Sequence, residues 1–230
     1  MQKNISLLNI LLEKLNDDKC VDEILIIDNS TKGFKGNFSK VKTIVSYKNL
    51  FVNPSWNLGI KNIKNDYFAI FNDDLVIPDN FCSKILSLLD KKNGLIGIDR
   101  DFIETLDNVL ELPNEDLVPF LIETKERNLH WGTIIMGHKN SYYQIPDNIL
   151  IWCGDDYLFK MNLKNNKKNY KLSNCYIKHI HGFTSLEDRF FRIKYNDCKN
   201  MKKYFSEFKI PKQFSLIKRI KRKFKQLLGH

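Results

Sequence analysis

The chain has 230 residues, of which 43% are hydrophobic, 28% charged and 12% aromatic. This composition provides enough apolar side chains for a core and excludes a wholly disordered, collagenous or coiled-coil chain. Seven of the ten excess positive charges lie in residues 211–230, which contain no Asp or Glu, so the body of the chain is close to neutral.

Helical and strand-like patterns alternate through the first hundred residues. The predicted elements are, in chain order, a helix over Ile5–Leu15, strands over Glu23–Ile27 and Val41–Ser46, a loop over Asn49–Pro54, a helix over Trp56–Ile63, a strand over Asp66–Phe71, a helix capped by Asp79 and ending at Leu89, and a strand over Leu95–Ile98. This alternation predicts an α/β sandwich with a mostly parallel central sheet.

The second half is less regular, and residues 100–150 mix short polar and apolar stretches. The pattern predicts strands near Thr133–Met136 and Ile149–Trp152, a helix or turn opened by Asp155 and Asp156, a strand over Cys175–His181, a helix over Leu186–Phe205, and a last helix from Pro211 to Leu228.

Cysteine spacing and hydropathy indicate the cellular compartment in which the protein is expected. The cysteines are scattered without a Cys-x-x-Cys pair, which predicts reduced, mostly buried thiols rather than a zinc knuckle or a disulfide framework. No window approaches the roughly 18 uninterrupted apolar residues of a membrane span, and Asn, Glu and Lys interrupt the first residues, unlike a secretory signal. A cytosolic protein is therefore expected.

Acidic side chains follow two of the predicted strands. Asn72, Asp73 and Asp74 end the strand over Asp66–Phe71, and Asp28 ends an earlier one. Ligands of such sheets bind beyond the carboxyl ends of the strands, and a divalent cation bridging to a diphosphate would relieve the repulsion between adjacent carboxylates. A solvated turn is the alternative, because Asn-Asp-Asp is favourable turn chemistry.

A second acidic pair and two histidines follow later in the chain. Asp155 and Asp156 suit a general base that takes a proton from a hydroxyl, or simply the first turn of a helix. His179 and His181 share one face of their predicted strand, where one of them would complete a metal site or contact a phosphate. A structural role for each histidine is the alternative.

The C-terminal tail has the pattern of a basic amphipathic helix. One apolar stripe is formed by Phe214, Ile217, Ile220, Phe224, Leu227 and Leu228, and most of the cations lie outside it. This pattern favours an anionic membrane surface, with a helix packed on the body as the alternative. Nucleic acid is not an expected partner, because no basic stripe interleaved with aromatic residues extends into the body.

Taken in order, these segments resemble the family 2-like glycosyltransferases of the GT-A fold. The segments that carry the resemblance are Val21–Thr31, Asn53–Ile60, Asp66–Pro78, Trp152–Asp156 and His179–Ser185. The resemblance implies a GT-A-like, Rossmann-like three-layer sandwich. It also implies one domain over residues 1–205, with a nucleotide-binding half at about 1–99 and an acceptor half at about 100–205, before the tail at 206–230.

The resemblance also implies roles for individual residues. Asp28 would contact the base or ribose of the donor, Asp73 its ribose, and Asn57 and Asn72 would add to the donor site. Asp74 would be the direct ligand of Mn²⁺ or Mg²⁺, with His181 or His179 completing the metal or diphosphate site. Asp156 would be the general base and Asp155 its neighbour, with the reverse assignment open.

The implied reaction moves a sugar from a nucleotide-sugar donor, with UDP favoured, to a surface-glycan or lipid-linked acceptor. The metal would stabilise the departing nucleoside diphosphate while the base activates the acceptor hydroxyl, which implies inversion at the anomeric carbon. With the tail, this places the expected enzyme in the cytoplasm, peripherally attached to the inner face of the membrane.

One departure from the family leaves an alternative open. The family opens with a central strand and a loop that holds the nucleotide base, but too few residues precede Ile24 for a strand plus a helix. Either the true start of the protein lies upstream of Met1, which would restore the enzyme, or the sheet lacks a central strand. In the second case, a non-catalytic binding or scaffold subunit with an incomplete nucleotide pocket is the rival interpretation. A nucleotidyltransferase is disfavoured, because no Gly-rich, Lys- or Arg-bearing phosphate loop follows an N-terminal strand.

Overall fold

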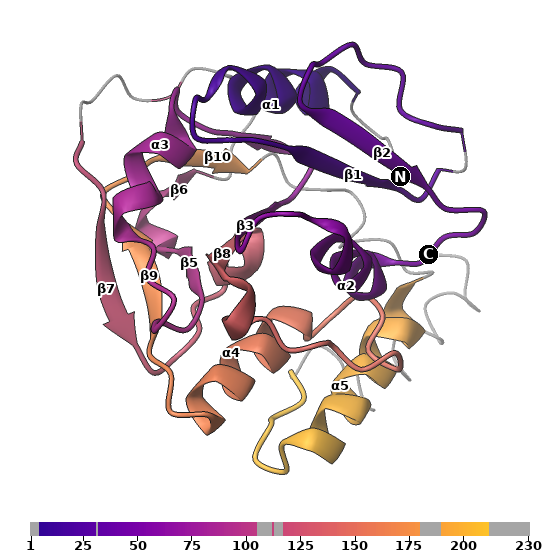
Figure 1. The fold of residues 1–230 in the computed structure, drawn as a ribbon. Coiled ribbons are helices and arrows are strands. Elements are labelled where there is room, and N and C mark those ends of the chain that lie inside the picture. The colour runs from indigo at the N-terminus through magenta and orange to yellow at the C-terminus, as the bar shows by residue number, and fades with distance from the viewer. Residues whose placement is uncertain (1–4, 31, 105–111, 113–116, 180–189, 212–230) are drawn as a thin grey trace, which may run out of the picture.

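The computed structural model of the chain describes residues 5–30, 32–104, 112, 117–179 and 190–211. The helices are α1 (Ile5–Asp17), α2 (Val52–Asn62), α3 (Phe81–Ile85), α4 (Gly154–Lys164) and α5 (Phe191–Tyr204), with 3₁₀ turns at Leu86–Leu88, Arg100–Phe102, Trp131–Thr133 and Lys139–Ser141. The strands are β1 (Ile24–Asp28), β2 (Val41–Val45), β3 (Tyr67–Phe71), β4 (Leu75–Val76), β5 (Ile96–Ile98), β6 (Ile103–Glu104), β7 (Phe120–Thr124), β8 (Ile134–His138), β9 (Asn169–Ser173) and β10 (Ile177–His179) (Figure 1).

The described strands form three sheets. β1 pairs in parallel with β2, β10 lies between β4 and β6, and the largest sheet has the order β3-β8-β5-β9-β7. The prediction of a mostly parallel central sheet is wrong, because β8 lies between β3 and β5 and runs antiparallel to both. β7 is also antiparallel to its neighbour, so β5 and β9 form the one parallel pair of this sheet.

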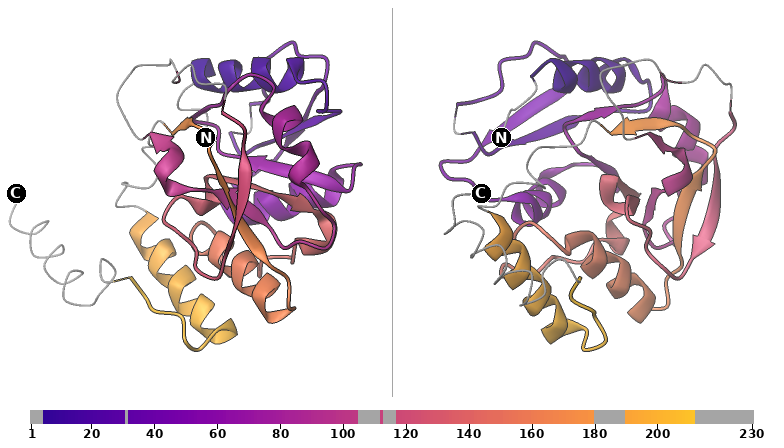
Figure 2. Two further views of the ribbon diagram at one scale, coloured as in Figure 1. Left: turned by 90° about the vertical axis from the view of Figure 1, so that its left-hand side faces the viewer. Right: turned by 180° about the vertical axis from the view of Figure 1, so that it is seen from behind.

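Helices cover both faces of the largest sheet, as expected for three layers. Phe68 and Ile135 belong to a core shared with α4 and α5, whereas Ile134 and Met136 belong to a second core on the side of α1 and α3. Neighbouring residues of β8 fall into different cores because side chains alternate across a strand. Figure 2 shows α1 at the opposite end of the molecule from α4 and α5.

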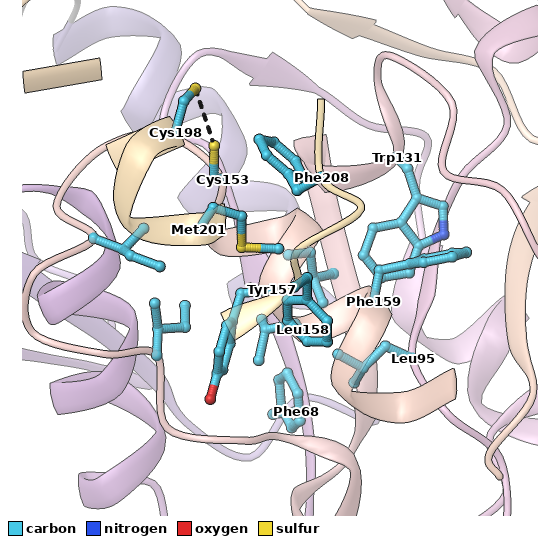
Figure 3. Packing of buried hydrophobic residues seen from close by; sticks show 14 residues of the cluster. Phe68, Leu95, Trp131, Cys153, Tyr157, Leu158, Phe159, Cys198, Met201 and Phe208 are labelled. Carbon is cyan, nitrogen blue, oxygen red and sulfur yellow. Dashed lines mark hydrogen bonds between the residues drawn. The ribbon is translucent and has the colours of Figure 1, made fainter. Parts of the chain in front are cut away.

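The first core is closely packed (Figure 3). The ring of Trp131 meets Phe159 edge-on, with 5.2 Å between ring centroids. The buried thiols of Cys153 and Cys198 lie 3.4 Å apart between their sulfur atoms and join the start of α4 to α5. All the cysteines are free and three of them are buried, which confirms the prediction of unpaired, mostly buried thiols.

Two predicted helices of the first half differ from the structure. α2 begins at Val52 rather than Trp56, because Pro54 fits the first turn of a helix, where its missing N–H is not needed. Asp79 does not cap α3, since Asn80 occupies the N-cap in a left-handed conformation and Asp79 pairs with Lys14 at 2.5 Å. The helix also ends at Ile85 and tightens into a 3₁₀ turn.

Two predicted strands of the second half also need correction. The segment Ile149–Trp152 is not a strand, because the backbone N–H groups of residues 150–152 donate hydrogen bonds to the buried carboxylate of Asp197 instead of to a neighbouring strand. The strand predicted over Cys175–His181 is β10 alone within the described residues, and His181 lies outside them. β7 and β9 were not predicted.

The C-terminal predictions are tested only in part. α5 confirms the helix predicted over Leu186–Phe205 where residues are described, and residues 186–189 lie outside that part. The basic helix predicted after Pro211 and up to Leu228 also falls on residues outside it. Within the described ranges, no helix has the length and apolar character needed to cross a membrane.

Candidate active site

A cavity of about 520 Å³ lies between β1 and β3. The two strands begin close together, because the backbone N–H of Lys64 donates to Glu23 at 2.5 Å and the amide of Asn65 donates to Asp22 at 2.7 Å. No strand of the described residues joins the β1–β2 pair to the larger sheet. Apolar side chains of α1 and α2 line the cavity, and Asp28 and Asp73 lie on its wall.

Asp28 ends β1 with a buried carboxylate that is 4% exposed. Its Oδ1 accepts the N–H of Ser30 at 2.6 Å, whereas its Oδ2 is buried and receives no hydrogen bond from the described residues. Burial is the largest influence and raises the pKa, but hydrogen bonds from Ser30 and Gly33 together lower the pKa overall. Asp28 therefore offers a carboxylate oxygen that a ligand hydroxyl or N–H would satisfy.

Two asparagines near the cavity hold the chain in place. Asn29 accepts the N–H of Leu50 at 2.9 Å and donates to the hydroxyl of Ser55 at 2.9 Å, which fixes the start of α2 at the end of β1. Asn57 is not on the cavity wall: its amide bonds the backbone of Ile145 and the hydroxyl of Tyr142. The predicted donor contact of Asn57 stays a prediction.

The acids after β3 meet a histidine from a distant part of the chain. β10 pairs antiparallel with β4 and sets His179 opposite Leu75, the residue after Asp74. This pairing brings Nε2 of His179 to 3.1 Å from Oδ1 of Asp74 and to 3.5 Å from the amide nitrogen of Asn72. The structure thus brings together three of the predicted site residues.

Asp73 is exposed and lies on the wall of the cavity. The protein around the cavity restricts hydration of its carboxylate and raises its pKa, and the neighbouring charge of Asp74 raises it further. Asp73 is therefore positioned to meet a ligand that enters from the cavity.

The pair Asp74 and His179 fits a metal ion shared with a phosphate ligand. Within the described residues, no group of three or more His, Cys, Asp or Glu is placed to hold a metal on its own. Two adjacent ligands of an octahedral ion at about 2.0–2.1 Å lie about 3 Å apart, which matches the Asp74–His179 spacing. Mg²⁺ is usually held by one or two carboxylates plus substrate phosphates, so the carboxylate of Asp74 with the phosphates of a donor would suffice, and His179 would add an imidazole ligand.

The second acidic pair lies in the first turn of α4, as predicted. Arg127 bridges the pair: its Nη1 lies 2.8 Å from Oδ2 of Asp155, and its Nε lies 2.6 Å from Oδ1 of Asp156. Burial disfavours the charged guanidinium, but the two carboxylates raise the pKa of Arg127 overall. Burial, with the charge of Asp155, raises the pKa of Asp156 to about 6.

The two carboxylates differ in how many of their oxygens are held. In Asp155, Oδ1 accepts the N–H of Asp156 at 3.0 Å and Oδ2 accepts from Arg127. A Cβ on Gly132 would overlap this carboxylate, so glycine is needed there. In Asp156, Oδ1 accepts from Arg127, whereas Oδ2 receives no hydrogen bond from the described residues.

A buried acid on α5 fixes the loop before this pair. Asp197 is 1% exposed and accepts the backbone N–H groups of Leu150, Ile151 and Trp152 at 2.8–2.9 Å. Asn53 of α2 donates to carbonyls of the same loop, at 3.0 Å to Ile149. The loop that delivers the acids to α4 is therefore tied to both halves of the molecule.

Comparison with known protein families shows which family the chain belongs to. A family model described as glycosyl transferase family 2 matches residues 5–152. The chain belongs to glycosyl transferase family 2. It is therefore a glycosyltransferase of the GT-A fold, which implies a nucleotide-sugar donor and an acceptor, and the resemblance inferred from sequence is confirmed. No curated protein matches the chain.

In this family 2 glycosyltransferase, sequence reasoning missed Arg127 and Asp197. Arg127 belongs to the charged run Lys125-Glu-Arg127, which reads as an ordinary polar loop. Asp197 interrupts a helical pattern with an acid, and only its burial reveals its role. The matched region ends at residue 152, before Asp155 and Asp156, so any role of these two acids has to be argued from the geometry around Arg127.

Proposed function

We propose that the chain transfers a sugar from a UDP-linked donor to a hydroxyl of a glycan or lipid-linked acceptor, with inversion and with Asp156 as the general base. The observation that carries this proposal is the asymmetry of the acidic pair. Three of the four carboxylate oxygens of Asp155 and Asp156 are held by hydrogen bonds, and Oδ2 of Asp156 is left to accept a proton.

The proton affinity of Asp156 supports the same role. With a pKa of about 6, its carboxylate is mainly ionised at neutral pH and is more basic than an ordinary aspartate. The acceptor hydroxyl would give its proton to Oδ2 as its oxygen bonds to the anomeric carbon. The bond from that carbon to the diphosphate would break, and the nucleoside diphosphate would leave.

On the donor side, Asp28 and Asp73 would bind the nucleoside, and Asp74 with His179 would hold Mn²⁺ or Mg²⁺. The buried, unbonded Oδ2 of Asp28 supports a contact with a ribose hydroxyl or a base N–H. The bound ion would neutralise charge on the diphosphate leaving group. The basic tail at 212–230 would bring the enzyme to an anionic membrane surface at the cytoplasmic face.

The test is transfer from UDP-sugars to hydroxyl acceptors by wild type, Asp156→Asn and Asp155→Asn, with Mn²⁺ present. Asp147→Asn is the matched control, since Asp147 is exposed. We expect Asp156→Asn to lower the turnover about 10²–10⁴-fold, the usual contribution of a general base. Wild-type turnover by Asp156→Asn, or a product with retained anomeric configuration, would refute the proposal.

A non-catalytic binding subunit is the second candidate, and the cavity favours it. The facing edges of β1 and β3 are not joined through the described residues, so the wall that would hold the donor base is open there. A folded chain that binds an acceptor glycan but neither UDP nor GDP, with or without Mn²⁺, would support this candidate over the enzyme.

A further inference from the structure

The segment before the 3₁₀ turn at Trp131–Thr133 contains a cation that the proposed reaction has not used. Arg127 contacts both acids of α4, and the side chains of Arg127, Asp155 and Asp156 are only 20%, 21% and 16% exposed. A guanidinium presents its donors in a planar fork, so one side chain can satisfy two carboxylates in fixed directions. The contact with Arg127 therefore fixes the orientation of the two carboxylates as well as balancing their charge.

We infer that Arg127 is a positioning residue of the transfer reaction, whose fork orients Asp155 and Asp156 so that Oδ2 of Asp156 faces the acceptor. This inference rests on the proposed function, because it explains how the proposed base is oriented. It names a residue that neither the family match nor the sequence pattern assigns.

Arg127 is itself held before any ligand binds. Its Nη1 also donates to the carbonyl of Asn128 at 3.1 Å. The amide of Asn128 donates to the carbonyl of Ile98 at 3.2 Å and its oxygen accepts the N–H of His130 at 3.0 Å. Since Ile98 is the last residue of β5, the fork is anchored to the end of a buried strand.

The same segment approaches the donor-side acids. The ring of His130 meets the ring of His179 edge-on, with 6.5 Å between centroids, and His179 contacts Asp74. Residues 127–132 therefore lie between the proposed metal pair and the proposed base. A shift of Arg127 would move the base relative to the donor.

Among the described residues, four groups influence how readily Asp156 binds a proton. Asp155 and Cys153 lie beside it at the start of α4, Lys160 lies one turn further along the same helix, and Arg127 comes from the opposing segment. Lys160 also forms an ion pair with Glu207 at 2.7 Å, and this second carboxylate weakens the effect of Lys160 on the pKa of Asp156. Arg127 is thus the cation in direct contact, and it lowers a pKa that burial and Asp155 raise.

Removing the guanidinium should therefore leave two adjacent carboxylates with like charge and raise the pKa of Asp156 above its value of about 6. Because the base must be deprotonated to act, the acid limb of the pH–rate profile should move to higher pH. A residue with a purely structural role would lower activity or stability without moving that limb.

The experiment compares pH profiles of UDP-sugar transfer for wild type, Arg127→Lys and Arg127→Gln, with Arg100→Gln as the control because Arg100 is exposed. We expect Arg127→Gln to move the acid midpoint up by about one pH unit, a tenfold change in proton affinity. Arg127→Lys keeps the charge but loses the fork, so it should move the midpoint less and lower kcat. Unchanged midpoints in both variants would overturn the inference.

A measurement that does not depend on sugar transfer tests this inference separately from the proposed function. The carboxyl carbon of Asp156 can be titrated by ¹³C NMR in the full chain and assigned by its loss in Asp156→Asn. A midpoint that rises in Arg127→Gln supports the inference even if no transfer is found, in which case the proposed function alone fails. If Arg127→Gln does not fold, Arg127→Lys is used instead, and a midpoint and a kcat both equal to those of wild type refute the inference.

Discussion

The two acidic groups of the molecule are held in very different ways. Asp155 and Asp156 contact Arg127 and lie beside a closely packed core, whereas Asp28 and Asp73 lie on the wall of a cavity between two separate sheets. The protein alone therefore sets the geometry of Asp155 and Asp156. At the cavity, which we propose as the donor site, part of the geometry is left for a ligand to complete.

Hydrogen bonding shows the same difference. Asp197 uses its carboxylate to fix the loop before α4, while Asp28 keeps one buried oxygen without a partner in the described residues. A buried polar atom without a partner costs about 1–3 kcal/mol, so a ligand that bonds Asp28 would recover that free energy. We therefore expect the donor side to be the less stable part of the free protein.

The largest expected effect on stability comes from Asp197→Ala. The change removes one carboxylate and leaves three backbone N–H groups of residues 150–152 without their acceptor. We expect a loss of about 3–5 kcal/mol in the free energy of unfolding, measured in urea. Asp147→Ala, at an exposed position of the same region, should change it by less than about 0.5 kcal/mol.

A matched pair of leucines tests the packing difference. Leu158 is fully buried in the core beside α5, whereas Leu12 of α1 is equally buried but borders the cavity. We expect Leu158→Ala to cost about 4 kcal/mol and Leu12→Ala about 2 kcal/mol, because atoms next to a void lose fewer contacts when removed. Equal losses in urea unfolding would contradict the contrast between the two regions.

A smaller effect concerns pH and Asp156. Folding raises the pKa of Asp156 from an ordinary value near 4 to about 6, so the folded state binds more protons than the unfolded state in between. The contribution of Asp156 to stability should therefore fall as pH rises from about 4 to about 6. The contribution of Asp156 is measured as the difference in thermal stability between wild type and Asp156→Asn over this pH range. A difference that does not vary with pH would contradict the raised pKa.

Local patterns in the sequence predicted the acids but not the groups that hold them. Asp28, Asp73 and Asp74 follow apolar strands, and Asp155 and Asp156 open a helix, so each is visible in a short window. Arg127 and Asp197 act across the fold, 28 and 46 residues from atoms that they contact. No periodicity within one segment reports such contacts.

The sheet illustrates the same limit. The pattern predicts β3, β5 and part of β8 as strands, but strand order and direction depend on pairing between distant segments. Ile149–Trp152 shows the reverse case: its apolar run suits a strand, yet the buried Asp197 binds its N–H groups and makes it a loop. Tertiary hydrogen bonds outweigh local propensity there.

The most direct test of the account is calorimetric titration of the full chain with UDP, and separately with GDP, with and without Mn²⁺. In the proposed metal site Asp74 and His179 supply two ligands, so we expect UDP to bind with Mn²⁺ present and to lose that affinity in Asp74→Asn. Absence of binding by a folded sample, or equal binding without Mn²⁺ and in Asp74→Asn, would contradict a metal-dependent donor site at this cavity.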